Sequence, residues 1–160
     1  MNPGPPAELV SRLALQPHPE GGWYREIYRS PTRVDTARGR RSALTTIYYM
    51  LEQNQLSRWH VVQADELWHF YAGSPLELLE YAPTTRKLTR HVLGHVGEGA
   101  TPVAVIPAGV WQAARSLGEY SLVGCTVGPG FEFTDFQLIS DLPSHADHFK
   151  GDLAPFAALL

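Results

Sequence analysis

Cysteine is scarce in this sequence: among 160 residues there is one, Cys125. A single thiol excludes an internal disulfide, so the fold does not depend on the cross-links that stabilise many small secreted domains. Cys125 lies in the apolar stretch 120–127. We expect a buried and unreactive thiol, because no activating base stands near it in the sequence.

Long hydrophobic runs are also missing. No segment approaches the ~20 consecutive apolar residues of a membrane-spanning helix. The N-terminus lacks the basic-then-apolar pattern of a signal peptide. We therefore expect a cytoplasmic protein that has no membrane partner.

Concentrated positive charge is absent as well. Thirteen Lys and Arg stand against 16 Asp and Glu, which gives a formal net charge of −3. Because nucleic-acid binding needs clustered Lys and Arg, we expect no nucleic-acid partner. The one basic run, 38–41, is interpreted as a solvated loop beside Arg33; the alternative is that it anchors an anionic group of a substrate.

What the sequence does contain is enough apolar material for one buried core. The hydrophobic content is 44%, and the length suits a single domain, here taken as residues 1–160. Apolar residues recur at helical spacing over 7–15, where Pro5 and Pro6 precede the segment and Pro17 ends it. We predict a short N-terminal helix there.

From residue 22 onward, short segments rich in β-branched and aromatic residues alternate with Gly, Pro, Asn or Asp. The predicted strands are 23–28, 43–51, 57–62, 67–71, 76–81, 88–93, 103–106, 111–115, 121–127 and 136–139. Many short strands without intervening helices predict an all-β sandwich or barrel over about 22–140.

A less regular tail occupies 141–160. Its last ten residues are apolar enough to cap the core or a partner subunit. His145 and His148 could share one face of a helix, but no third ligand accompanies them, so we interpret them as surface residues.

Two motifs in the middle of the chain resemble the paired motifs of the cupin barrel. His60, Glu66 and Gly73 match the first His, the Glu and the closing Gly of the first motif, and Pro107 and Gly109 match the second motif. Two of the four metal-ligand positions of that pattern are filled differently. Val62 stands in place of the second His and Gln112 in place of the last His.

Further segments resemble the small cupins grouped as DUF985 (cupin-5), over about residues 7–140. These segments are 18–26, 46–49, 59–60, 65–73, 107–112 and 124–131. The resemblance implies a single-domain cupin double-stranded β-helix, or jelly-roll barrel, which is usually a homodimer and structurally similar to the dTDP-sugar epimerases. It implies a fold more firmly than an activity.

Strand parity places candidate site residues on the inner face of this barrel, since alternate side chains of a strand share a face. His60 and Val62 then point the same way, as do Glu66, Trp68 and Phe70, while His69 points outward or into an interface. We predict His60 and Glu66 as catalytic residues. The predicted substrate-binding residues are Trp68, Phe70, Gln112, Tyr48 and Tyr49.

A metal site would have to combine His60, Glu66 and Gln112. This set offers one nitrogen and two oxygens, whereas the iron oxygenases use two His and a carboxylate. We therefore favour no cofactor, and keep a divalent metal held by these three residues as the alternative.

Acid–base chemistry needs less from the same residues. A His can take or give a proton near neutral pH, so His60 is predicted as the base and Glu66 as its orienter or as a second acid–base group. The opposing acid is one of four tyrosines: Tyr24, Tyr48, Tyr49 or Tyr71.

The leading hypothesis is a metal-independent isomerase or epimerase that acts on a small polar compound such as a sugar or nucleotide sugar. An aromatic pocket with a few polar groups suits such a ligand. The alternatives are a metal-dependent oxygenase or isomerase and a non-catalytic ligand-binding or sensor protein.

A glycine pair lies within the family-like segment 18–26. Gly21 and Gly22 are predicted to supply the positive φ angles of a tight turn. Arg25 and Glu26 are neighbours along a strand and face opposite sides, so the alternative is that one of them enters the pocket or a dimer interface. Glu20, Arg25 and Glu26 are interpreted as surface or interface ion pairs.

Overall fold

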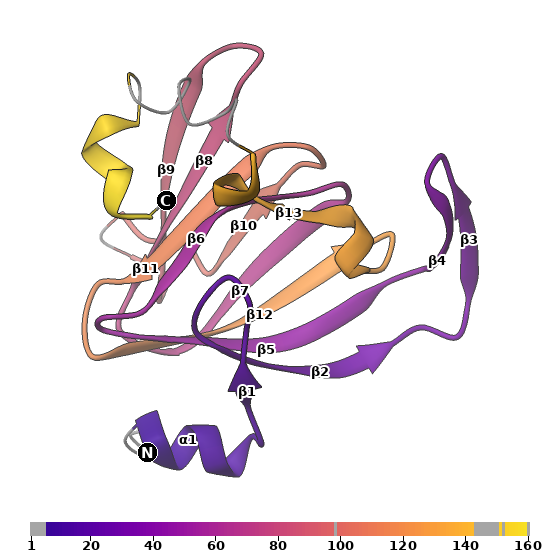
Figure 1. Cartoon of the computed structure of the whole chain (residues 1–160). Helices are drawn as coiled ribbons and strands as arrows, with labels where there is room; N and C mark the ends of the chain where they lie inside the picture. Colours follow the sequence, from indigo (N-terminus) through magenta and orange to yellow (C-terminus); the bar gives the residue numbers. More distant parts are fainter. Residues whose placement is uncertain (1–5, 98, 143–150, 152, 160) are drawn as a thin grey trace.

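The computed structural model describes residues 6–97, 99–142, 151 and 153–159. Two antiparallel sheets pack face to face, and the chain crosses repeatedly between them (Figure 1). The larger sheet contains, in order, β1 (Gln16–Pro17), β2 (Trp23–Arg29), β5 (Thr45–Glu52), β12 (Tyr120–Gly128), β7 (Asp65–Gly73) and β10 (Val103–Ile106). The smaller contains β13 (Phe136–Leu138), β6 (Leu56–Val62), β11 (Trp111–Ser116), β8 (Leu76–Ala82) and β9 (Lys87–Leu93). The predicted all-β jelly roll is confirmed.

All ten predicted strands are present, and each of their ends lies within two residues of the predicted one. This agreement follows from the alternation of inward apolar and outward polar side chains. Along β5 the inward side chains change from Leu51, in the core between the sheets, to Ile47 and Thr45 at one end of the sandwich, where they line a cavity. The core therefore fills one end of the sandwich and leaves the other hollow.

The N-terminal helix α1 (Pro6–Arg12) begins one residue before the predicted start and ends three residues before the predicted end. It ends early because Ala14 adopts a φ of 51°, which a right-handed helix cannot contain. Leu9 and Leu15 pack with Met50 on the outer face of the larger sheet. The helix thus covers apolar surface that would otherwise face water.

The C-terminal segment covers the outer face of the smaller sheet. Leu153 precedes the 3-10 helix η3 (Ala154–Leu159), and Leu159 is its last residue. Both pack with Trp59 and Trp111. The predicted apolar cap is therefore present in the described part of the tail, whereas 145 and 148 lie outside the described residues. None of the helices in the described part of the chain has the length and hydrophobicity that a membrane span requires.

The basic run 38–41 is not a solvated loop. It forms the turn and second strand of a hairpin, β3 (Arg33–Thr36) and β4 (Gly39–Ser42), which projects from the sandwich (Figure 1). Arg38 and Arg41 each donate from Nε to the buried carboxylate of Asp135 at 2.8 Å. Their hydrogen bonds hold the pKa of Asp135 below its usual value. Because both guanidinium groups already bind this carboxylate, they are not free to anchor an anionic group of a substrate.

The turn between β1 and β2 contains the predicted positive φ angles, 114° at Gly21 and 73° at Gly22. A side chain at Gly21 has no room, because an ideal Cβ there would lie 1.9 Å from the carbonyl oxygen of Leu56. The turn therefore requires glycine for two reasons, its backbone conformation and its close approach to β6.

We predict that Gly21→Ala lowers the free energy of unfolding by roughly 3 kcal/mol or more, because steric overlap adds to the backbone strain. Gly97→Ala is the matched control: its φ is also positive, at 131°, but nothing lies within 4 Å of the added Cβ. The control should cost only the conformational strain, about 1–2 kcal/mol. Urea unfolding of both variants measures the difference, and equal losses would show that the contact with Leu56 does not matter.

Candidate active site

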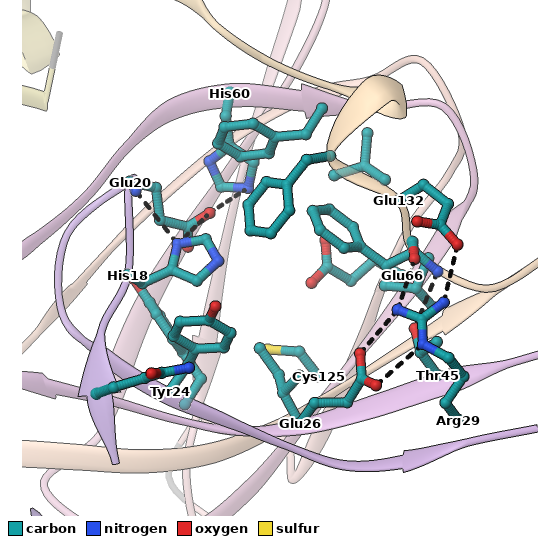
Figure 2. Close-up of a pocket in the computed structure, with 18 residues that line it drawn as sticks. His18, Glu20, Tyr24, Glu26, Arg29, Thr45, His60, Glu66, Cys125 and Glu132 are labelled. Atoms are coloured by element: carbon teal, nitrogen blue, oxygen red, sulfur yellow. Dashed lines mark hydrogen bonds and ion pairs between the residues drawn. The ribbon is translucent and has the colours of Figure 1, made fainter.

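A cavity of about 150 Å³ opens at the hollow end of the sandwich. Strands β2, β5, β6, β7 and β12 supply its walls, and the segment 131–136, which includes the 3-10 helix η1 (Phe133–Asp135), covers one side. Figure 2 shows His60 and Glu20 on one side of the cavity and Arg29 with Glu26 and Glu132 on the other.

The hydrogen bonds of His60 define where its protons lie. Nδ1 is 2.7 Å from the carbonyl oxygen of Arg58, and a carbonyl only accepts, so Nδ1 carries a proton. Nε2 is 3.3 Å from Oε2 of Glu20. A carboxylate only accepts, so this contact is a hydrogen bond when Nε2 also carries a proton.

Glu20 is ionised in this environment. Its side chain is buried, and burial alone raises a carboxyl pKa, but attraction to His60 and His18 and a hydrogen bond from Ser57 outweigh burial and lower the pKa. Ser57 Oγ donates to Oε1 at 2.8 Å. The interpretation of Glu20 as a surface or interface ion pair is therefore wrong, since the carboxylate faces the interior and holds His60.

His18, on the other side of Glu20, is neutral. Its Nδ1 accepts the backbone N–H of Glu20 at 3.2 Å, so the ring proton is on Nε2. Burial lowers the pKa of His18 and outweighs the attraction of Glu20. The ring–carboxylate distance of 3.6 Å would be an ion pair only for a protonated ring; the backbone hydrogen bond argues for the neutral form. The two histidines thus carry opposite proton arrangements.

Glu66 belongs to a separate chain of hydrogen bonds. Trp68 Nε1 donates to Oε1 of Gln112 at 2.9 Å, and Gln112 Nε2 donates to Oε2 of Glu66 at 2.5 Å. Burial raises the pKa of Glu66 to about 7, and the charge of Glu20 adds to that increase while His60 opposes it. Near neutral pH this carboxyl is therefore present in both forms and can take or give a proton.

The same chain tests the metal ligand set of His60, Glu66 and Gln112. An indole N–H needs an acceptor, so Trp68 fixes the amide oxygen of Gln112 toward itself and leaves the NH2 group facing Glu66. A metal would have to break both hydrogen bonds to reach that oxygen. Among the described residues, no group of three or more His, Cys, Asp or Glu is arranged to hold a metal ion. These residues do not fit a metal centre.

The predicted substrate-binding residues are divided by the structure. Tyr49 lines the cavity together with the two predicted catalytic residues, His60 and Glu66. Trp68 and Gln112 are buried behind Glu66, where they support it rather than line the cavity. Phe70 packs against the core and beside the ring of His95, 5.2 Å away.

Of the four tyrosines considered as the acid, two face the cavity and two face away. Tyr24 and Tyr49 line it, whereas the rings of Tyr48 and Tyr71 meet each other at 6.2 Å outside the cavity lining. The hydroxyl of Tyr49 donates to the carbonyl of Gly21 at 2.7 Å, and burial raises its pKa well above the ordinary value. Tyr24 is therefore better placed than Tyr49 to meet a ligand.

Several lining residues have no counterpart in the sequence prediction. Phe131, Phe133 and Phe136 form an aromatic wall, and Arg29 closes the rim. Phe131 belongs to a family-like segment, which was a signal, but no local pattern distinguishes Phe133 or Phe136 from core phenylalanines. The expectation for Cys125 is confirmed: it is buried, and burial raises its pKa well above the ordinary value.

Residues 7–139 match the family model described as the cupin superfamily (DUF985). The chain belongs to this cupin family. No curated protein matches it. The predicted family is thus confirmed, while the likeness to dTDP-sugar epimerases and the homodimer that the resemblance implied stay predictions.

Solved structures support the same conclusion. A hypothetical protein from Leishmania major is 30% identical with a TM-score of 0.85, and the match covers 93% of this chain and 95% of that one. A protein from Shewanella oneidensis is 33% identical with a TM-score of 0.81, and the match covers 94% of this chain and 96% of that one. Oxalate decarboxylase from Bacillus subtilis is 14% identical with a TM-score of 0.61, over 90% of this cupin and 36% of that chain. That last likeness shows the fold alone.

We predict that Nδ1 of His60 carries a proton, because it lies 2.7 Å from the carbonyl oxygen of Arg58, which only accepts. Long-range ¹H–¹⁵N spectra of the imidazole rings identify the protonated nitrogens. His18 serves as the internal control and should carry its proton on Nε2, because its Nδ1 accepts the backbone N–H of Glu20. A His60 ring without a proton on Nδ1 would contradict the contact with Arg58.

The raised pKa of Glu66 predicts a pH-dependent cost to stability. The folded state binds a proton more tightly than the unfolded state, so stability falls as pH rises from 4.5 to about 7. Glu66→Gln removes this loss. The difference in free energy of unfolding between the variant and the wild type should therefore grow by about 3 kcal/mol, in favour of the variant, between pH 4.5 and about 7. Urea unfolding at several pH values measures the gain. The control is Glu119→Gln at an exposed position, whose stability should depend on pH as that of the wild type does. The same dependence in Glu66→Gln would contradict the raised pKa of Glu66.

Proposed function

We propose that this cupin is a metal-independent isomerase or epimerase that transfers protons on a small polar molecule bound in the cavity. One observation carries the proposal: His60, in contact with Glu20, and Glu66, whose pKa is raised to about 7, line the same cavity. The environments of the two carboxyls push their protonation in opposite directions, since the pKa of Glu20 is lowered and that of Glu66 is raised, and such groups are the usual parts of acid–base catalysis. The volume of about 150 Å³ suits a ligand of about one ring.

The contacts support particular roles for three residues. Ionised Glu66 takes a proton from a carbon that is acidified by a neighbouring carbonyl. His60 gives its Nε2 proton to the carbonyl oxygen, and the product is an enol. In an isomerisation, protonated Glu66 gives its proton to the former carbonyl carbon, while the hydroxyl on the neighbouring carbon gives its proton to His60 and becomes the new carbonyl. In an epimerisation, an acid on the opposite face, for which Tyr24 is placed in the lining, protonates the first carbon; the enol hydroxyl returns its proton to His60, Glu66 passes its proton to solvent and Tyr24 regains one from solvent. Glu20 holds the His60 ring.

These roles differ from the sequence prediction in their direction. The prediction made His60 the base and Glu66 its orienter or a second acid–base group. The hydrogen bonds favour Glu20 as the orienter, His60 as the first donor and Glu66 as the first acceptor. Because the reaction is reversible, each group serves as acid in one direction and as base in the other.

Proton exchange with solvent tests the proposal before the substrate is known. We expect wild-type protein in D2O to exchange a carbon-bound proton in at least one member of a panel of small hydroxy- and amino-carbonyl compounds, followed by ¹H NMR. His60→Gln and Glu66→Gln should lower that rate by at least about 10²-fold. His91→Gln, which alters a pair with Glu80 outside the cavity lining, is the matched control and should leave the rate unchanged.

The pH profile of that exchange identifies Glu66. The rate should rise with pH through about 7, because Glu66 must be ionised to accept the proton. This rise should be absent from the residual rate of Glu66→Gln. Exchange that needs an added divalent metal would favour the metal-dependent alternative, and no exchange across the panel would favour a non-catalytic binding protein.

A further inference from the structure

We propose that the cavity selects a small, ring-sized molecule that carries a protonated amine, with the ammonium group at the rim between Glu132 and the phenylalanines of segment 131–136. The proposal rests on the proposed function only in that both use the same cavity. The sequence prediction named a small polar molecule such as a sugar or nucleotide sugar, whereas this proposal names a cationic ligand.

The first argument is the charge of the rim. Arg29 donates from Nε and Nη2 to the two oxygens of Glu26, from Nη1 to Oε1 of Glu132, and from Nη2 to the carbonyl of Phe131. Four of the five N–H donors of this guanidinium are therefore in use. One positive charge faces two carboxylates, so the rim carries a net negative charge, as Figure 2 illustrates.

The neighbouring cations lie outside the cavity lining. Arg38 and Arg41 share the single carboxylate of Asp135 and so carry one surplus positive charge. Neither of them lines the cavity, however, and Arg41 attracts Glu132 only from a distance. The described side chains that line the cavity include no Lys, and Arg29 is the one among them with a permanent positive charge. A phosphate or diphosphate would have to displace a carboxylate from Arg29 in order to bind.

The interior adds no compensating charge. Glu20 is ionised and His18 is neutral, and a proton on both nitrogens of His60 would at most cancel the charge of Glu20. Glu66 contributes a further negative charge whenever it is ionised. When Glu66 is ionised, both the rim and the interior of the cavity are negative. When Glu66 is protonated, the rim still is. The electrostatic potential of the cavity therefore attracts cations and repels anions.

The second argument is the aromatic wall beside the rim. The rings of Phe131 and Phe133 meet edge to face at 5.0 Å, and Phe133 is 51% exposed although it is apolar. Aromatic faces next to carboxylates bind ammonium groups through the ring quadrupole. Glu132 lies between these two residues in the sequence and, among the described residues, contacts Arg29 through Oε1 alone. Its Oε2 can accept from the ammonium.

The third argument is size. A cavity of about 150 Å³ is comparable to one that holds a single benzene ring. With its ammonium group at the rim, a ligand of this size extends its uncharged ring inward toward His60 and Glu66. The amine thus gives orientation, and the acid–base pair meets the uncharged part of the molecule.

Three probes that share one ring and differ in charge test the proposal: benzylammonium, benzyl alcohol and benzoate. Each is titrated at pH 7 and low ionic strength into ¹⁵N-labelled full-length protein, and the amide shifts of residues 131–136 are followed. We expect benzylammonium to bind at least threefold more tightly than benzyl alcohol and benzoate not to bind. High salt should weaken the binding of benzylammonium alone.

Two variants of the rim separate charge from structure. Glu132→Gln removes a negative charge and should weaken benzylammonium binding roughly three- to fivefold, whereas Arg29→Gln removes a positive charge and should strengthen it by a similar factor. Both variants break the same Arg29–Glu132 pair, so a merely structural role would change binding in the same direction. Glu119→Gln, outside the cavity lining, controls for net charge and should leave the affinity unchanged.

Equal affinities for the three probes, tighter binding of benzoate, or no shift with benzylammonium would each overturn the proposal. So would effects of the same sign in the two rim variants. These outcomes are independent of the D2O exchange experiment. Proton exchange on an anionic or neutral compound would support the proposed function and refute the preference for a protonated amine. Selective binding of the amine without any exchange would support that preference and refute the proposed function.

Discussion

The site depends on one buried carboxylate, Glu20, which lies between two histidines of opposite proton arrangement. Moving a charge into a protein interior costs several kcal/mol unless hydrogen bonds and an opposite charge replace the lost water. Here Ser57 and His60 supply those contacts. Glu20 reaches them only because the turn at Gly21 approaches the backbone of Leu56 too closely for any side chain. A backbone constraint thus sets the position of the carboxylate that contacts His60.

The second carboxylate, Glu66, differs because its hydrogen-bonded amide partner, Gln112, is uncharged. Both carboxylates are buried, yet the pKa of one is lowered and that of the other is raised to about 7. The attraction of His60 acts on both but is stronger at Glu20, which contacts it directly. Opposite shifts in neighbouring acids are how a protein obtains a donor and an acceptor at one pH. In the proposed mechanism, the contrast between the pKa values of Glu20 and Glu66 is the contribution of the cavity to proton transfer.

The sequence predicted the strands well because burial on one face of a sheet imposes alternation, which is a local pattern. It missed β3 and β4 because their arginines are fixed by Asp135, which lies 97 positions from Arg38 and 94 from Arg41 along the chain. It placed His60 and Glu66 in one cavity through a family motif, but assigned Glu20 to the surface, since a carboxylate beside two glycines is typical of an exposed turn. Only the tertiary approach of β6 to that turn shows that the carboxylate is buried.

The departures from the cupin metal pattern have a chemical consequence beyond the loss of ligands. Gln112 occupies a ligand position, but Trp68 fixes its oxygen and turns its NH2 group toward Glu66. A neutral donor stabilises a carboxylate less than a cation does, so burial dominates and the pKa of Glu66 rises to about 7. Val62, at another ligand position, lines the cavity with an apolar side chain and adds nothing that would lower this pKa. The departures from the cupin ligand pattern thereby give Glu66, which stands at one of the ligand positions, a pKa at which it can exchange protons near neutral pH.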